Sequence, residues 1–365
     1  KSALPHLRGI RCEERDEALL LDAATRRNLE LDSSLSGRAE STLVGVLDHT
    51  ATAMGARELR RWAQRPLRTR APREHRLQAI EAFLDTGLHE AVHSLLRRVG
   101  DIERILARVA LRSARPRDLA GLRDALGCLP ELRDVLQGID SPLLVQLAES
   151  AGPHPDVHAL LASAIVQTPP ALLREGGVMA PGFDADLDEL RRISEHSDEA
   201  LLELEARERE RTGFANLRFG YNRVQGYYIE VSRSQAEQVP ADWVRRQTVK
   251  NAERYITAEL KSFEDKVLGA RDRALARERE LYEALLDRLT ESLPKLQATA
   301  SAVAALDVLA TLAERALALR LTRPQLVDES RIEIRGGRHP VVEQHLDGPF
   351  VPNDLSLHDG RRMLI

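Results

Sequence analysis

The chain has 365 residues and a formal net charge of −4, with 43% hydrophobic, 30% charged and only 4% aromatic residues. This composition is ordinary for a protein with a buried core, and it excludes a largely disordered chain and an aromatic-rich β-sandwich. The slightly acidic balance gives no global electrostatic argument for a nucleic-acid partner. The two cysteines, Cys12 and Cys128, exclude a disulfide framework and a cysteine-rich zinc site, so we expect a reducing compartment.

The sequence predicts no membrane partner. Its longest apolar stretch, 300–319, is interrupted by Asp307, Glu314 and Arg315, which argues against a bilayer span. The amino-terminal residues show no cationic start followed by a long apolar run, so we do not expect a signal peptide.

The first half of the chain is predicted to be helical. From residue 50 to about 135, apolar residues recur at spacings of three and four, which is typical of amphipathic helices. One such stripe runs from Val92 to Val109 and predicts a single helix. The next begins at Pro116, a residue that the first turn of a helix tolerates. Residues 138–182 contain six prolines and predict a connection with one short helix near 157–165.

Two long helical segments follow, at 184–211 and 257–293. At 1.5 Å per residue the first spans roughly 40 Å, so the pair is expected to form a long antiparallel arm. A further helix rich in alanine and leucine is predicted at 296–319.

The segment 214–257, between the arm helices, differs from its surroundings. It holds seven of the chain's 13 aromatic residues. Alternation within 227–232 predicts a strand that directs one set of side chains to the same face: Tyr227, Ile229 and Val231. Residues 244–255 also look extended. We therefore predict a small β insertion at the tip of a helical arm.

This insertion is the first candidate for function. It carries seven basic and four acidic residues, a local charge of +3 in a chain of −4. Cations and polar turn residues suit phosphate contact, because both donate hydrogen bonds to phosphate oxygens. The alternative is a mildly basic hairpin used for solubility or for contact between subunits.

Other motifs are weak. His89 to His93 match H-E-x-x-H, but no further ligand follows at a zinc-protease spacing, so we predict no metal site. The sequence lacks the phosphate loop G-x-x-x-x-G-K-[ST] and the nucleophile elbow G-x-S-x-G. From residue 324 the character changes, and we predict short strands that open another domain at Ile332–Ile334, Val341–Val342 and Met363–Ile365.

Two stretches of the insertion, GYNRVQGYYIEVS at 220–232 and RQTVKNAERY at 246–255, closely resemble the clamp of the MutS family of bacterial DNA mismatch-repair proteins. Three further stretches agree in the same order: DAATRRNLEL at 22–31, GDIERI at 100–105 and GRHPVVE at 337–343. The resemblance covers essentially the whole chain.

The resemblance implies a mainly α fold: a long helical lever bundle with a small β-rich clamp at its tip, and the first strands of a truncated α/β ATPase domain. The implied domains are a connector remnant at 1–20, a core and lever at 21–197 and 258–321, the clamp at 198–257, and the start of the ATPase domain at 322–365.

The implied DNA-binding residues lie on two turns of the clamp: Asn222, Arg223, Gln225, Arg246, Lys250 and Asn251. Phe350 falls where the family stacks an aromatic ring on the adenine of ATP. Because the phosphate loop is absent, this fragment is expected to bind no cofactor and to hydrolyse no ATP. The full-length protein is expected to be a DNA-dependent ATPase that uses ATP and magnesium.

The implied function is DNA mismatch repair, with the clamp gripping duplex DNA without sequence preference and the lever helices coupling nucleotide state to that grip. The implied partners are double-stranded DNA, a second copy of the chain as a homodimer, and a MutL-like repair protein, in the bacterial cytoplasm at the nucleoid. Two alternatives stay open: a MutS relative that acts in recombination, and a structural coiled-coil arm whose β tip binds protein.

Overall fold

The computed structural model describes residues 17–195, 197–222, 226–249 and 252–363. These form two compact units, one from residues up to 162 and from 287 onward, the other from residues 163–286. Both units are mainly helical, and the small sheets match the predicted mainly α fold. The predicted domain boundaries remain a prediction, and most of the predicted connector remnant lies outside the described residues.

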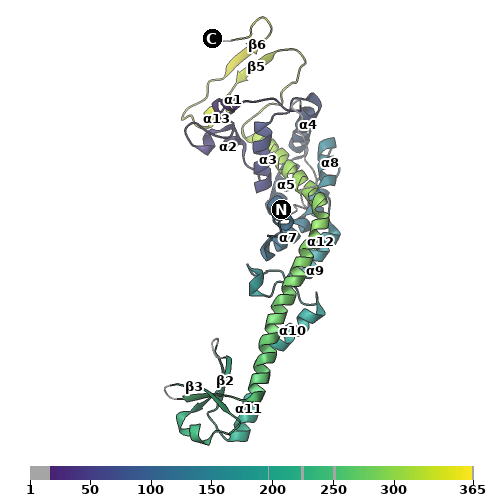
Figure 1. Cartoon of the computed structure of the whole chain (residues 1–365). Coiled ribbons are helices and arrows are strands. Elements are labelled where there is room, and N and C mark those ends of the chain that lie inside the picture. Colours follow the sequence, from purple (N-terminus) through teal and green to yellow (C-terminus); the bar gives the residue numbers. More distant parts are fainter. Residues whose placement is uncertain (1–16, 196, 223–225, 250–251, 364–365) are drawn as a thin grey trace, which may run out of the picture. The chain divides into compact units, whose positions relative to one another are not determined.

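Short helices build most of the first unit (Figure 1). In chain order they are α1 (Ala23–Asn28), α2 (Leu43–Leu47), α3 (Ala53–Gln64), α4 (Arg70–Thr86), α5 (Leu88–Leu96), α6 (Ile102–Ala110), α7 (Pro116–Val135), α8 (Pro142–Ser150) and α9 (Pro155–Ala164), with a 3₁₀ turn at Ala39–Ser41. Their core includes fully buried leucine, isoleucine and phenylalanine side chains, among them Phe83, Leu96 and Ile102.

The prediction of one helix from Val92 to Val109 was wrong, because α5 ends at Leu96 and α6 begins at Ile102. The side chain of Asp101 accepts a hydrogen bond from the backbone N–H of Arg104 (3.2 Å) and so caps a new helix. The apolar residues on both sides of the break are buried, among them Val92 and Leu96 of α5 and Ile102 and Val109 of α6.

Proline marks helix starts in this unit. Pro116 lies in the first turn of α7, as predicted, and Pro142 and Pro155 begin α8 and α9. The region 138–182 therefore holds two helices where one was expected.

Helix α12 (Ala258–Ala318) has 61 residues and replaces the two helices predicted there. Pro294 lies inside it, and the helix continues past this proline because Leu293 and Leu296 on either side are buried in the core. By length and composition alone α12 could cross a membrane, since one of its 18-residue windows has a mean hydropathy of 1.5. That window is 72% buried within the protein, so its apolar side chains serve as core.

A buried carboxylate fixes α12 to the first unit. Asp307 is fully buried and accepts hydrogen bonds from the backbone N–H groups of Ala51 (2.9 Å) and Thr52 (2.8 Å) and from the Thr52 hydroxyl (2.7 Å). These donors lie at the start of α3, whose free N–H groups favour an anion. Gly55 makes this approach possible, because a Cβ there would lie 2.1 Å from Asp307 Oδ2.

In the second unit, α10 (Ala185–Glu195) and α11 (Ser197–Thr212) run alongside α12. Two ion pairs set their direction: Asp184 Oδ2 lies 2.7 Å from Arg277 Nη2, and Arg207 Nη2 lies 2.9 Å from Glu259 Oε1. Asp184, at the start of the first segment, pairs with the later residue of α12, and Arg207, near its end, pairs with the earlier one. The α10–α11 segment and α12 are therefore antiparallel, which confirms the predicted arm.

A second buried carboxylate closes this arm. Glu278, on α12, is 2% exposed and accepts hydrogen bonds from the backbone N–H groups of Gly177, Val178 and Met179 and from Arg191 Nη2 (2.7 Å). The extended residues that it binds also form a bridge between Ile165 and Met179.

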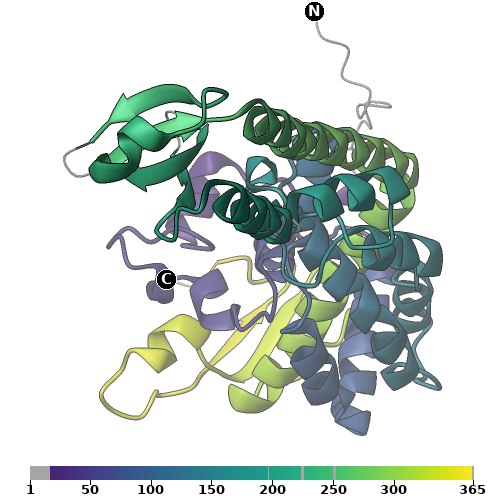
Figure 2. The same cartoon turned by 90° about the horizontal axis from the view of Figure 1, so that it is seen from below.

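The chain enters a four-stranded sheet from α11 and leaves it into α12 (Figures 1 and 2). Its strands are β1 (Arg218–Asn222), β2 (Gly226–Ser232), β3 (Val244–Thr248) and β4 (Ala252–Ile256), all antiparallel, in the order β1-β2-β4-β3. A 3₁₀ segment (Arg233–Gln238) links β2 towards β3. The predicted strands at 227–232 and within 244–255 are confirmed.

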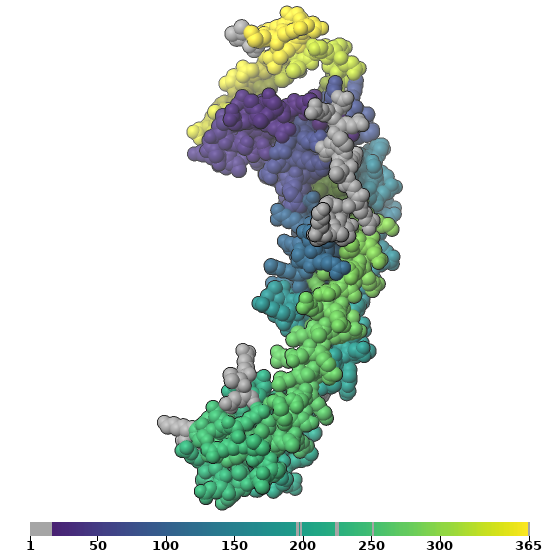
Figure 3. Space-filling view, viewed as in Figure 1, coloured from purple at the N-terminus to yellow at the C-terminus, as the bar shows by residue number. Residues whose placement is uncertain are grey.

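The carboxyl-terminal part of the first unit holds β5 (Ile332–Gly337), α13 (Pro340–Gln344) and β6 (Asn353–Leu357). Figure 3 shows this segment in yellow at the surface near the purple residues of α1 and α2, and His345 Nε2 lies 3.3 Å from the carbonyl oxygen of Glu40. The predicted strand at Ile332–Ile334 is confirmed.

The strand predicted at Val341–Val342 was wrong. Pro340 occupies the first turn of α13, and His339 Nδ1 accepts a hydrogen bond from the backbone N–H of Val342, so the segment is capped as a helix. Met363 is not in a strand, and residues 364–365 lie outside the described chain.

Candidate nucleic-acid interface

An aromatic core holds the four-stranded sheet in shape. Tyr227, Ile229 and Val231 of β2 are at most 9% exposed, as the alternation predicted. They pack with Trp243 and with Leu260 of α12 in one cluster. Trp243 packs edge-on against Phe214 (6.3 Å between ring centroids), and Tyr227 packs edge-on against Phe263 (5.4 Å). This core fixes the sheet on α12 and leaves the opposite face of β2 polar.

The polar face carries a stacked arginine. Arg254 of β4 lies over the ring of Tyr228, 4.1 Å from its centroid, and donates a hydrogen bond to Glu230 (2.9 Å). Gly220 on β1 leaves room for that ring, since a Cβ there would lie 2.7 Å from it. Arg254 is therefore already compensated within the sheet.

The first predicted turn connects β1 and β2. Asn222, the last residue of β1, pairs with Gly226, which has a φ of +75° that favours glycine. Asn222 is half-buried. The other two predicted residues of this turn, Arg223 and Gln225, lie outside the described residues.

The second predicted turn connects β3 and β4. Lys250 and Asn251 lie outside the described residues, whereas Arg246 is placed. The strand register shifts between Arg245 and Gln247, so Arg246 occupies a β-bulge. Bulges turn a side chain out of its regular direction.

Arg246 does not belong with the turn that follows it in sequence. Its guanidinium Nη2 lies 3.8 Å from Glu264 Oε1 on α12, and its side chain is 26% exposed. Glu264 also accepts a hydrogen bond from the backbone N–H of Tyr227 (2.7 Å), at the start of β2. The structure thus connects Arg246 with the first hairpin, through a helix that the sequence motifs did not include.

The two hairpin turns lie at opposite ends of β2. Asn222 pairs with Gly226 at its first residue, and Ala252 pairs with Ser232 at its last. At about 3.3 Å per residue, these ends are separated by roughly 20 Å. The candidate residues therefore do not form one compact patch.

The sequence analysis counted other cations of this sheet in its local charge but did not place them in the candidate site. Arg218 on β1 and Arg233 after β2 are exposed, and among the residues that the structure describes neither guanidinium group has a hydrogen-bond or ion-pair partner. Arg245, in contrast, lies 3.2 Å from the buried carboxylate of Glu253. Arg218 pairs with Glu230 of β2, which places it on the polar face of an edge strand.

Glu264 was missed as well. It lies four residues after Leu260 and three before Val267, both buried, so a carboxylate interrupts the apolar face of α12. That interruption was the available signal, because a charge on a buried face needs partners.

The H-E-x-x-H match shows different contacts for its two histidines. His89 Nδ1 lies 3.2 Å from the carbonyl oxygen of Phe83, and His93 Nε2 lies 2.6 Å from that of His49. Within the described residues, no group of three or more histidine, cysteine, aspartate or glutamate side chains could hold a metal ion.

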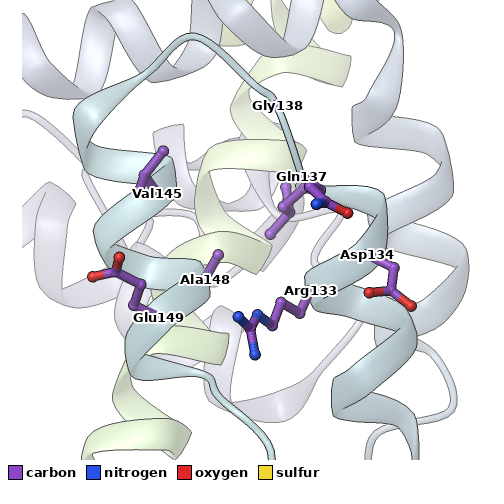
Figure 4. Close-up of a pocket in the computed structure, with 8 residues that line it drawn as sticks. Arg133, Asp134, Gln137, Gly138, Val145, Ala148 and Glu149 are labelled. Carbon is purple, nitrogen blue, oxygen red and sulfur yellow. The ribbon is translucent and has the colours of Figure 1, made fainter.

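The surface cavities of the first unit offer no better site. One, of about 280 Å³, lies between α7 and α8, and Arg133 extends across it toward α8 (Figure 4). Its lining mixes Arg133, Asp134 and Glu149 with apolar residues. None of the candidate residues from the sequence lines it.

A family comparison covers most of this architecture. Residues 24–313 match the model of MutS domain III. The chain belongs to the MutS family. The matched range includes the whole four-stranded sheet, α10, α11 and most of α12. This confirms the resemblance read from the sequence, and it assigns the protein in general terms to a family of DNA-binding mismatch-repair proteins.

Phe350 lies beyond the MutS domain III match, in the connection between α13 and β6, and is partly buried. A nucleotide needs donors for its phosphates as well as a ring for its base. This sequence contains no phosphate loop, so the adenine-stacking role of Phe350 stays a prediction for the full-length protein.

Proposed function

We propose that this chain grips duplex DNA through backbone contacts of its four-stranded sheet, as the clamp of a MutS-family mismatch-repair protein. The family match across residues 24–313 carries this proposal, because it includes the sheet and the helices that support it. The local charge of the 214–257 segment, +3 in a chain of −4, supports it. Arginine, lysine and backbone N–H groups contact phosphates without reading sequence.

The proposal gives roles to residues at both ends of β2. Arg246, Arg223 and Lys250 are the proposed cationic contacts, and Asn222, Gln225 and Asn251 are neutral donors beside them. Arg218 and Arg233 extend the set, because both are exposed cations of the same sheet.

In the intact protein, the proposal extends to ATP-dependent control of this grip, to pairing of two copies, and to a MutL-like partner. For the chain itself we propose no ATP hydrolysis and no preference for mismatched DNA. Mismatch discrimination requires base contacts or DNA deformation, and phosphate contacts alone supply neither.

A salt titration tests the proposal. Each neutralised phosphate contributes about −0.9 to the slope of log K against log salt, so replacing Arg223, Arg246 and Lys250 by alanine should reduce the slope by about 2 to 3. The loss should be equal for two unrelated duplexes and for a G·T duplex.

The matched control replaces three exposed arginines of the first unit by alanine: Arg331, Arg335 and Arg362. It removes the same charge, so its slope should stay near that of the original chain. Equal effects of the two triple variants would contradict the clamp assignment. An unchanged slope with intact thermal melting would favour the protein-binding alternative.

A further inference from the structure

Glu264 is a buried carboxylate at the meeting point of the two hairpins. It is 5% exposed and lies on the face of α12 that also buries Leu260 and Val267. Three groups surround it: the backbone N–H of Tyr227 (2.7 Å), Lys261 Nζ (2.7 Å) and Arg246 Nη2 (3.8 Å). A carboxylate this deeply buried needs such partners to offset the loss of hydration.

The backbone of the first hairpin is shaped around this carboxylate. A Cβ at Gly226 would lie only 2.0 Å from Glu264 Oε2, so no other residue fits there without displacing the side chain. Gly226 also has a φ of +75°. The start of β2 therefore closes directly onto Glu264.

The second hairpin reaches the same carboxylate through its bulge. In a regular strand the side chain of Arg246 would point to the face opposite to those of Arg245 and Gln247. The register shift between these neighbours allows it to point in another direction. Its guanidinium then lies against Glu264, with about a quarter of the side chain still exposed. A guanidinium held in this way has a restricted orientation and stays partly exposed, as a side chain that contacts a phosphate must be.

We propose that Glu264 is a positioning residue for DNA binding: it holds Arg246 of the second hairpin beside the paired ends of β1 and β2, so that both hairpins serve one phosphate contact. This inference rests on the proposed function of the sheet. It assigns to α12 a direct part in arranging the interface, through a residue that does not itself contact DNA.

The direction in which Glu264→Gln changes DNA affinity separates a positioning role from simple charge balance. Glu264→Gln keeps an oxygen that can accept from the Tyr227 N–H but removes the charge that holds Arg246. If Glu264 merely neutralises the interface, its loss should tighten DNA binding and steepen the salt slope. If it positions Arg246, binding should weaken by about tenfold, the scale of one lost charge-assisted hydrogen bond, and the slope should fall by about 1.

A double-mutant cycle on the full chain provides the readout that a general structural role would not move. Arg246→Ala alone should weaken binding about as much as Glu264→Gln, and the two together should be no weaker than either. Additive losses would overturn the inference, as would unchanged or tighter binding by Glu264→Gln.

The matched control is Glu278→Gln, a second buried glutamate of α12 that accepts from the 177–179 backbone and from Arg191. It should lower the melting temperature without changing the salt slope. If it weakens DNA binding as much as Glu264→Gln does, positioning of Arg246 is wrong.

Should Glu264→Gln fail to fold, Glu264→Asp replaces it. This variant keeps the charge but withdraws the carboxylate by one methylene, so the inference expects weaker binding and charge balance alone expects no change. The proposed function fails separately, if the original chain shows no salt-dependent binding at all. Original binding that Arg246→Ala weakens and neither Glu264 variant changes would overturn only the positioning role.

Discussion

Two stretches of α12 show how one helix is anchored in two different ways. In the second unit Glu278 accepts hydrogen bonds from three backbone N–H groups and from the guanidinium of Arg191. In the first unit Asp307 accepts only from neutral donors, the N–H groups of Ala51 and Thr52 and the Thr52 hydroxyl. Both carboxylates are almost completely buried.

The difference lies in how the buried charge is compensated. Glu278 has a full positive charge 2.7 Å away, whereas Asp307 depends on backbone dipoles at the start of α3. Burial accordingly raises the pKa of Asp307 above its ordinary value, and the hydrogen bonds from Thr52 and Ala51 oppose this only in part. Glu278 and Asp307 are thus the residues through which α12 binds the backbone at 177–179 and at the start of α3.

The largest effect is expected for Glu278→Ala. Removing this carboxylate leaves three N–H groups without their acceptor and deprives a mostly buried guanidinium of its closest anion. Breaking a buried pair on one side costs about 3–5 kcal/mol, so the free energy of unfolding should fall by that amount. Urea denaturation measures it, and hydrogen exchange should show faster exchange at Val178 and Met179 with no change at Thr52.

Its control is Glu280→Ala, two residues farther along α12, where the side chain is 69% exposed. That variant should change the free energy of unfolding by no more than about 0.5 kcal/mol. Similar losses for the two variants would show that helix propensity, rather than the buried contacts, sets the effect.

A smaller loss is expected for Asp307→Ala, about 2 kcal/mol, because no cation is left stranded and the burial cost of the carboxylate disappears with it. Hydrogen exchange should now accelerate at Ala51 and Thr52 and stay unchanged at Val178. The control Asp287→Ala removes an exposed carboxylate of α12 that pairs with Arg112. A loss for Asp307→Ala as large as that for Glu278→Ala would remove the distinction between the two anchors.

Much of the fold was predictable from local patterns. Alternation identified β2 with its buried face, and spacings of three and four identified most helices. The errors occurred where a single cap decided the outcome: Asp101 starts a second helix inside an apolar stripe, and His339 with Pro340 starts a helix where two valines suggested a strand. Two helices were predicted, at 257–293 and 296–319, but burial on both sides of Pro294 keeps α12 continuous.

The candidate site was only partly predictable, because its contacts join distant residues. Sequence spacing grouped Arg246 with the turn that follows it, while the bulge and Glu264 bring it to the other hairpin. A register shift between paired strands cannot be recognised from the order of neighbouring residues. The contact between α12 and Tyr227 cannot be recognised in this way either. What sequence did show was a glutamate on an apolar helix face, and its partners depend on the tertiary structure.

The smallest effects concern pH, where the two parts of α12 should respond with opposite sign. In the second unit, Arg277 donates hydrogen bonds to Asp184 and thereby lowers the pKa of that carboxyl below its ordinary value of 3.8. The ionised form is therefore favoured in the folded state. The stability that it contributes is present above pH 3.8 and is lost as the pH falls through the lowered pKa.

For Asp307 the sign is reversed, because its folded pKa is raised. Its contribution is fully present below the ordinary pKa of 3.8 and is lost as the pH rises through the raised value.

Asparagine removes the titration at either position, so the advantage of the original chain over Asp184→Asn should grow with pH, and its advantage over Asp307→Asn should shrink. The Asp184 effect should reach about 1 kcal/mol at most, since this pair is partly exposed. Urea midpoints for the three proteins between pH 3 and pH 7 measure both slopes. Parallel slopes would mean that the donors at the start of α3 stabilise the Asp307 carboxylate as fully as Arg277 stabilises that of Asp184. A cation and a set of neutral donors would then be equivalent partners for a carboxylate in this protein.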